Sequence, residues 1–476
     1  MSPLRHFLGP VLALSLVGLP ASADEPAAPP TAPPMAPPMA PEGQEPEEVD
    51  AIAWHVSADS YARLFQRAAV PGPSGSLVQA DFAAPFYQYA LLQVRDIDLP
   101  WAKDSVDVEL SAWGNVEMAT AGTGGRRLDG DITVARVTHR IGPGYVGFGR
   151  QIYAGGAARF VRFDGLRAGI AAPFGLGLDA YGGFTVLPRW SARPGYYALG
   201  NAADTLLDDP STLESPSRSQ YWLAGARGYY RFHERFEVGA SFHEQREDGG
   251  LGRRNLGGDL RLALVDEVTL RSRAVMDLDA TDLTELRVAL DMAPRKDVDV
   301  GLGFFHAVPA LFLSRQSVLS VFSTSAYDEI GADLGYRPIR ALALGVEGWA
   351  QRFTAGDLGA RLGGQARLRP DLPTKPILVL AYRRILEPIN GYHSLRAAVS
   401  AHPIPPLLLS TEVFTYLYDA PIQGVSTSFV GIQSVRYAFV DWLAATLSGS
   451  AAQTPYAEHD LQALARIEID VEGGSR

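Results

Sequence analysis

The sequence predicts an all-β protein: a transmembrane antiparallel β-barrel with an even number of strands, about 22 and within a range of about 18 to 22, with both termini periplasmic. Three observations support this prediction. Segments of about ten residues alternate apolar and polar side chains. Short and long connections alternate between those segments, and the chain begins with the pattern of a secretory signal.

The alternation of side chains runs from about residue 51 to the end of the chain, and it is clearest in 236–244, 268–278, 358–368 and 461–471. A period of two is typical of a strand with two different faces. A soluble sandwich would show the same pattern, with its charged face in water. In a membrane barrel the apolar face meets lipid and the charged face lines the lumen. We therefore expect the lipid face to include Leu270, Met276, Leu362, Ile467 and Ile469.

The connection lengths favour the barrel, because bacterial barrels have short periplasmic turns and longer extracellular loops. The short set is 141–144, 172–175, 233–235, 265–267, 294–297, 337–340 and 403–406. The longer or more polar set is 119–129, 188–218, 247–253, 308–325, 353–356, 387–390 and 452–459. Strand parity then requires 82–97 to run toward the periplasm and 51–66 to precede it as the first strand.

Aromatic residues and the even, helix-free spacing add support. Tyr and Trp fall mainly near the proposed strand ends, where interface girdles place them, and Tyr145, Tyr153 and Tyr181 are among them. No change in composition marks a second domain, whereas a soluble sandwich of this length would usually be divided.

The beginning of the chain predicts export. Arg5 and His6 precede an apolar run from Phe7 to Leu19, and the small triplet 21–23 follows as an A-x-A cleavage site. We expect 1–23 to be a signal peptide, 24–50 a disordered, Pro-rich periplasmic leader, and 51–476 the barrel. An uncleaved anchor helix is the alternative, but the run is shorter than the about 20 residues that a spanning helix needs. The leader either contacts the cell wall or has no partner.

Composition excludes several classes of site. The chain has no cysteine, so it has no disulfides and no thiolate metal sites. Its formal charge of −11 argues against a nucleic-acid partner. No pair of histidines has ligand spacing on one strand face, and we expect no metal and no cofactor. His393-Ser394 and Glu458-His459-Asp460 could supply a nucleophile or an oriented imidazole, but no second motif supports either, so we expect no enzyme activity.

The stretch 145–169, YVGFGRQIYAGGAARFVRFDGLRAG, resembles the GRQ…FDG signature of alginate-export-type and related substrate-specific porins. The residues that carry the resemblance are Gly149, Arg150, Gln151, Arg159, Phe163, Asp164 and Gly165. The resemblance implies an outer-membrane barrel that passes anionic or neutral saccharides and other small solutes.

Charged residues of the predicted lumen face are the candidates for selectivity. Three consecutive predicted strands carry Asp259 and Arg261, Arg271, Arg273 and Asp277, and Glu285 and Arg287, which could form a ladder of opposed charges. The other candidates are Arg361, Gln365, Arg367 and Arg466. Arginine clusters favour carboxylate, phosphate or sulfate through two-pronged contacts. A solvated wall joined by ion pairs, with no role in selectivity, is the alternative.

The connection 308–325 is unusually apolar for an extracellular loop. Folded inward, it would constrict the pore with Arg315 and Gln316 at its polar tip. Folded outward, it would contact lipid or a partner subunit in a homo-oligomer.

The favoured interpretation is a porin-like channel in the bacterial outer membrane, surrounded by lipid, for diffusion of small polar or anionic solutes or saccharides. A structural or surface-binding barrel, whose loops at 188–218 and 308–325 bind a partner, is the alternative. A barrel hydrolase is the third hypothesis.

Overall fold

The computed structural model describes residues 52–66, 70–71, 77–78, 82–98, 104–118, 128–186, 221–247, 249–309, 326–354, 356–388, 390–455 and 457–474. The predicted signal peptide and leader lie outside these residues, as do the loop 188–218 and the tip of 308–325 with Arg315 and Gln316. In the described part of the chain no helix is long and apolar enough to cross a membrane.

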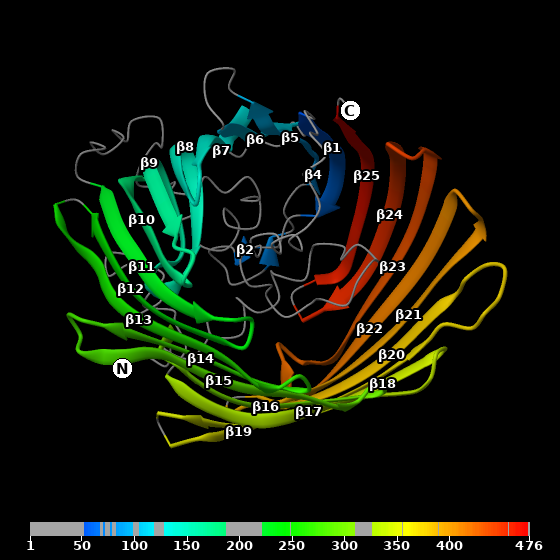
Figure 1. The fold of residues 1–476 in the computed structure, drawn as a ribbon. Helices are drawn as coiled ribbons and strands as arrows, with labels where there is room; N and C mark the ends of the chain where they lie inside the picture. Colours follow the sequence, from blue (N-terminus) through cyan, green and yellow to red (C-terminus); the bar gives the residue numbers. More distant parts are fainter. Residues whose placement is uncertain are drawn as a thin grey trace.

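One antiparallel sheet runs through the molecule and closes on itself (Figure 1). Its strands follow one another in chain order. The first strand, β1 (Ala53–Gln66), pairs with the last, β25 (Ala457–Gly474). The short β4 (Phe82–Ala83) continues into β5 (Pro85–Asp98), so the sheet is a closed barrel of 22 strands. The predicted fold class is confirmed.

The remaining strands complete the wall. The first nine of them are β6 (Ser105–Glu117), β7 (Leu128–Ile141), β8 (Gly144–Gly155), β9 (Arg159–Ala171), β10 (Leu176–Thr185), β11 (Trp222–Phe232), β12 (Phe236–Glu247), β13 (Gly250–Val265) and β14 (Val268–Asp277). Next come β15 (Asp282–Arg295), β16 (Val298–Ala307), β17 (Tyr327–Ile339), β18 (Leu342–Phe353), β19 (Leu358–Leu368), β20 (Ile377–Leu386), β21 (Tyr392–Ile404), β22 (Leu407–Ile422), β23 (Val425–Val440) and β24 (Leu443–Thr454). A single 3-10 turn, η1 (Gly156–Ala158), joins β8 to β9, while β2 (Val70–Pro71) and β3 (Leu77–Val78) pair with each other in a separate small sheet.

The two ends of the barrel differ in their connections. Because Ala53 pairs with Gly474, β1 begins and β25 finishes at the same end, which we call the terminal end. Every short connection predicted from the sequence lies at this end, including 142–143 between β7 and β8 and 266–267 between β13 and β14. The opposite end is called the loop end.

Two of the predicted long connections at the loop end are wrong. Only 248–249 separate β12 from β13, and only 455–456 separate β24 from β25, where the sequence predicted 247–253 and 452–459. The polar residues there, such as Arg253 and Arg254, belong to strand ends. Near the mouth of a barrel a strand carries polar side chains on both faces, so composition alone resembles a loop.

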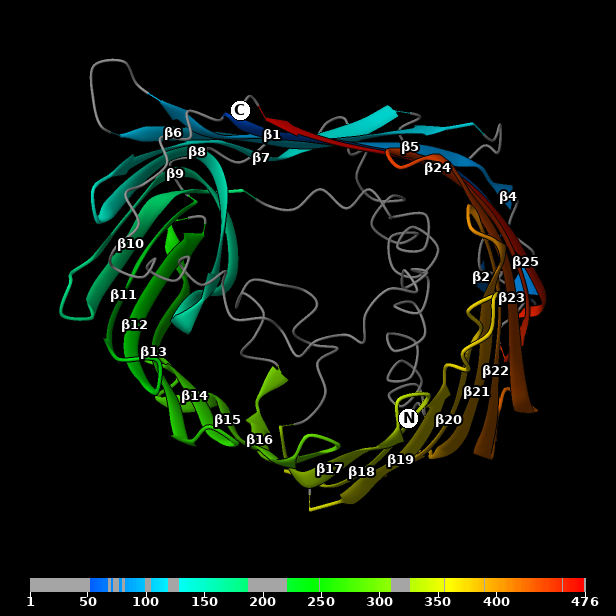
Figure 2. The same ribbon diagram turned by 45° about the vertical axis from the view of Figure 1, so that its right-hand side comes forward.

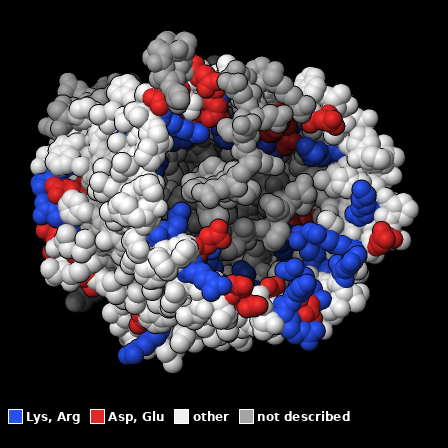
Figure 3. All heavy atoms as spheres, in the orientation of Figure 1, with Lys and Arg blue, Asp and Glu red and all other residues white. Residues whose placement is uncertain are grey.

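The wall has an apolar outer surface and a charged inner surface, as the alternation predicts. Leu362 and Ile467 lie outward and are 51% and 50% exposed. Their chain neighbours Arg361 and Arg466 lie on the inner face and form ion pairs. Figure 3 shows basic and acidic side chains gathered around the hollow at the centre of this view.

Several aromatic residues depart from the girdle pattern, and Tyr145 is one, since its hydroxyl donates to Asp179 on the inner face. Two others lie deeper. Tyr153 and Tyr181 are 5% and 6% exposed and belong to a buried cluster inside the barrel. The prediction that they mark an interface girdle is wrong, because both lie on the inner faces of their strands, where another segment covers them.

Replacing Leu362 with arginine tests the outer surface. If this surface lies in lipid, the charge should cost about 2 to 4 kcal/mol and lower the yield of folded barrel. Gln365→Arg on the inner face of the same strand is the matched control and should assemble. The measurement is the folded fraction in lipid vesicles, from gel mobility with and without heating. Equal yields for both variants would contradict the face assignment.

Candidate functional site

The β8–β9 hairpin leaves the wall at its loop end and folds into the lumen. In the described residues β8 pairs with β7 from Ile141↔Gly144 to Ala135↔Arg150, and there the ladder stops. Beyond that point β8 and β9 stay paired with each other as far as Gly155↔Arg159. Figure 2 shows the cyan hairpin curving inside the green strands β10 to β13. It forms a second layer on the inner wall and narrows the lumen.

Two glycines of the GRQ…FDG signature lie where the hairpin bends. Gly149 has φ +115, and a Cβ there would lie 2.2 Å from the carbonyl oxygen of Ala135. A Cβ at Gly165 would lie 2.1 Å from the carbonyl oxygen of Gly182. Glycine alone tolerates both the conformation at the first position and the backbone contact at the second.

A cluster of four charges holds the base of the hairpin. Arg150 donates from Nε and NH2 to the two oxygens of Asp164, at 2.7 and 2.9 Å, which is the two-pronged geometry of a strong charge-assisted contact. Asp131 on β7 accepts from Arg150 at 3.0 Å and pairs with Arg162 at 2.8 Å. These side chains are largely buried, so removing one partner would leave an uncompensated charge. The cluster ties the hairpin to the strand from which it departs.

Hydrogen bonds between wall side chains and the backbone of the hairpin tip fix the tip to the inner wall. The Ala157 N–H donates to Ser241 Oγ at 2.8 Å on β12, and Asn255 Nδ2 on β13 donates to the Ala157 carbonyl at 3.3 Å. Arg273 on β14 donates to the Gly156 carbonyl at 2.8 Å. The tip therefore recovers from wall side chains some of the pairing that it gives up on leaving the sheet.

An apolar cluster fills the space between hairpin and wall. Its members are Tyr153, Ala158, Val161, Phe163, Tyr181 and Leu223. The rings of Tyr153 and Tyr181 stack with centroids 4.1 Å apart, and Tyr181 Oη lies 3.0 Å from Nδ1 of buried His243. Burial of these apolar side chains stabilises the inward position of the hairpin through the hydrophobic effect.

Arg159 joins the hairpin to a more distant strand. Its Nε donates to Glu285 Oε2 at 2.9 Å and its NH2 to Thr284 Oγ1 at 3.0 Å, both on β15. The next residue, Phe160, lies on the opposite face of the hairpin and is 64% exposed. The hairpin thus carries an exposed apolar side chain on the face that does not contact β15.

The signature residues are brought together by the structure, and their geometry is that of a bend and a docking surface. Gln151 is buried and donates from Nε2 to the Gly165 carbonyl at 3.0 Å, and Phe163 is fully buried. Sequence reasoning missed their partners Tyr181, Leu223 and Ser241. One signal was present: apolar or small residues occupy inner-face positions of β10 to β13, where the pattern elsewhere places charges.

The charged inner wall differs in detail from the predicted ladder. Arg261 lies opposite Arg271, and Arg273 lies opposite Arg287, so these neighbours have like charges. Other contacts join opposite charges. Asp259 lies opposite Arg273 and pairs with Arg227 at 2.6 Å, Arg271 pairs with Asp291 at 2.7 Å, and Arg273 lies 3.9 Å from Glu285. Two of the predicted candidates, Arg273 and Glu285, thus form an ion pair, whereas the cross-strand register places Arg261 and Arg287 opposite other arginines.

The other candidates divide into paired, structural and unpaired residues. Arg466 pairs with Asp59 at 2.8 Å, and Arg361 lies 3.4 Å from Glu329. Asp277 is buried, and its Oδ1 accepts the N–H groups of residues 279 and 280, so it caps the turn after β14. Across the strands that the structure describes, the inner-face residues without an ion pair include Arg261, Arg287 and Arg367.

The residues considered for catalysis do not assemble into a triad in the described part of the chain. His393 Nδ1 lies 2.8 Å from the hydroxyl of Tyr382. The side chains of Glu458 and His459 lie outside the described residues.

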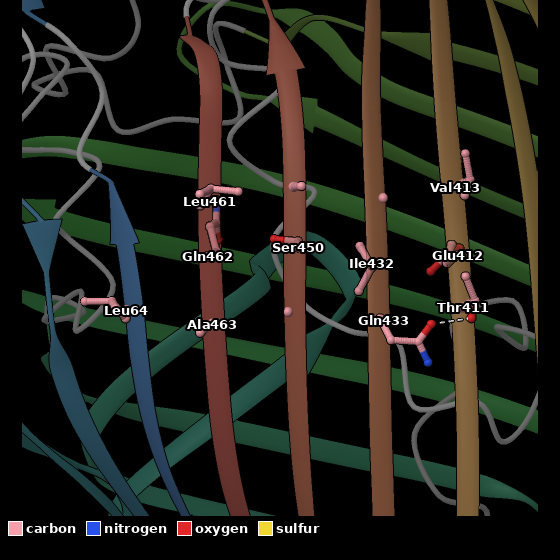
Figure 4. A pocket seen from close by; sticks show the side chains of 13 residues that line it. Leu64, Thr411, Glu412, Val413, Ile432, Gln433, Ser450, Leu461, Gln462 and Ala463 are labelled. Carbon is pink, nitrogen blue, oxygen red and sulfur yellow. Dashed lines mark hydrogen bonds between the residues drawn. The ribbon is translucent and has the colours of Figure 1, made fainter.

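A shallow groove crosses the wall between β22 and β1 (Figure 4). Small residues form its floor, and the Thr411 hydroxyl donates to Gln433 Oε1 at 2.5 Å. By alternation with exposed Phe429 and Val435, Gln433 lies on the outer surface of the barrel. The groove is therefore separate from the lumen.

A disulfide tests the docked position of the hairpin. The chain has no cysteine, so Ala157→Cys with Ser241→Cys creates one thiol pair. We expect it to oxidise readily, because Ala157 N lies 2.8 Å from Ser241 Oγ. Ala154→Cys with Ser241→Cys is the control, since Ala154 is exposed on the opposite face. Loss of free thiol in the control but not in the test pair would contradict the docking.

Comparison with known proteins gives a likeness of shape. No protein-family model and no curated protein sequence matches this chain. The P pilus usher (PapC) translocation pore is 6% identical, with a TM-score of 0.46, and the match covers 90% of this chain and 99% of that chain. A BenF-like porin from Pseudomonas fluorescens Pf-5 is 10% identical, with a TM-score of 0.44, over 89% and 99% of the two chains. Pseudomonas aeruginosa OpdK, solved with vanillate, is 12% identical, with a TM-score of 0.40, over 88% and 99%. In structure the chain is thus similar to outer-membrane channels.

Proposed function

We propose that this protein is a porin-like channel of the bacterial outer membrane, through which small polar or anionic solutes or saccharides diffuse. In this proposal 1–23 direct export, the terminal end faces the periplasm, and the apolar outer surface meets lipid. The observation that supports it most is the closed barrel with charged residues on its inner face. A barrel of this strand number is too wide for its own side chains to fill.

The β8–β9 hairpin is proposed as the inner layer that sets the pore size. It is anchored at its base by Arg150, Asp164 and Asp131, and at its tip by Ser241. Contacts at both ends favour a fixed constriction over a swinging lid. Its exposed face carries Phe160, so the narrowed passage would have one apolar side and charged walls elsewhere.

The unpaired inner-face arginines are proposed to favour anions. Arg261 and Arg287 are exposed on neighbouring parts of the wall, and each faces another arginine across the strand ladder. Neither has an ion pair within the described strands, and guanidinium groups bind carboxylate or phosphate with two hydrogen bonds.

The alternative function, a structural barrel whose outer loops bind a partner, depends on 188–218 and 308–325, most of which lie outside the described residues. A refolded barrel that conducts no ions would favour it.

Displacing the hairpin should enlarge the pore. A Cβ at Gly257 would lie 2.6 Å from Ser241 Oγ and 2.9 Å from Ala157 N, so Gly257→Leu should push the tip away from the wall. Gly258 lies on the other face of the strand, and a Cβ there would be 3.9 Å from the nearest atom. Gly258→Leu is therefore the matched control. We expect single-channel conductance to rise in the first variant only. Equal conductance in both variants and the wild type would show that the hairpin does not limit the pore.

Reversing an unpaired charge should change ion preference. Glu in place of Arg287 should lower the anion-to-cation permeability ratio, measured as the reversal potential in a salt gradient. Arg235→Glu makes the same charge change in a terminal-end turn, where Arg235 pairs with Asp266, and should have a smaller effect. A larger change in the permeability ratio for Arg235→Glu than for Arg287→Glu would contradict the role of Arg287.

A further inference from the structure

Three potential metal ligands meet where the barrel closes. His55 lies on β1, and Asp470 and Glu472 lie on β25; in the seam His55 is directly opposite Glu472. His55 Nε2 lies 2.7 Å from Asp470 Oδ1, and one ligand atom from each of the three side chains lies within 4.8 Å of the others. The three residues are on the inner face, near the terminal end.

The negative charges of Asp470 and Glu472 are not balanced by arginine in the described part of the chain. Deeper along the same seam, Asp59 pairs with Arg466, and Glu468 pairs with Arg466 and Arg436. In the part of the chain that the structure describes, Asp470 has His55 as its ion-pair partner and Glu472 has no arginine or lysine partner. Two carboxylates and one imidazole thus share a site with excess negative charge.

The ligand set fits one class of ion. Zinc accepts imidazole nitrogen and carboxylate oxygen in a tetrahedral arrangement, and three protein ligands leave the fourth position for water. Calcium and magnesium prefer oxygen ligands alone, so the imidazole disfavours them. We propose that His55, Asp470 and Glu472 bind a divalent cation of the zinc type, which ties the first strand to the last.

The position gives the cation a structural effect. His55 and Asp470 are 415 residues apart in the sequence, and a bound cation would cross-link them. A cation that binds the folded barrel and not the unfolded chain stabilises the folded state by mass action. Zinc should therefore raise the unfolding temperature of the barrel.

The test is a zinc titration of the full-length, refolded protein after treatment with a chelator, read by calorimetry and by thermal unfolding. The variants are His55→Ala and Glu472→Gln. His306→Ala is the matched control, because His306 lies 2.7 Å from Asp328 in a similar pair that no third ligand joins within the described strands.

We expect one saturable zinc site in the wild type and in His306→Ala. In His55→Ala and Glu472→Gln the affinity of this site for zinc should fall by about tenfold or more. The zinc-dependent rise in unfolding temperature should be lost with it, and calcium should not replace zinc. Glu472→Gln keeps the size of the side chain, so it remains informative if His55→Ala fails to fold. Undiminished zinc binding in both seam variants, or no binding by the wild type, would overturn the proposal. Neither result bears on conductance, so the test is independent of the proposed channel.

Discussion

Pairing of the first strand with the last is the interaction on which the rest of this structure depends. The ladder between β1 and β25 runs from Ala53↔Gly474 to Phe65↔Gln462 and turns an open sheet into a closed one. Closure pairs the first and last strands with each other and separates an inner from an outer face along the wall. The apolar side chains can then lie outside and the ion-paired charges inside, an arrangement that an open sheet of this size could not maintain in a membrane.

The β8–β9 hairpin is the main departure from this plan, and its contacts explain how it persists. Leaving the wall forfeits ladder hydrogen bonds with β7 beyond Arg150. Ser241, Asn255 and Arg273 supply replacements at the tip, and buried aromatic rings cover the space beneath. Because the anchors belong to β12, β13 and β14, the hairpin also ties β8 and β9 to strands that lie a few positions further along the wall. A fixed inner layer narrows a wide barrel.

Much of the wall was predictable because strand alternation and turn residues are local signals. The segment 268–278 and the turn at 142–143 are examples that the structure confirms.

The inward hairpin was not predictable in the same way, since its strands alternate whether they lie in the wall or inside it. Its GRQ…FDG residues drew attention through resemblance, but the partners of Arg150 and Arg159 lie on other strands and depend on register. The charge ladder is present only in part for the same reason: Arg273 pairs with Glu285, whereas Arg261 and Arg271 lie opposite each other. The apolar connection 308–325 was one candidate for a constriction, with an outward fold as the alternative, and its tip lies outside the described residues. The hairpin provides an inner layer that the sequence pattern did not suggest.

The central claim is that the hairpin is a docked, permanent layer inside the closed barrel. Amide hydrogen exchange of the full-length protein in lipid vesicles measures this most directly, because exchange rates report local opening segment by segment. Amides of 151–163 should exchange as slowly as those of β12, against which the tip is bonded. Exchange of 151–163 as fast as that of the turn at 278–281, with the wall strands still protected, would contradict the account.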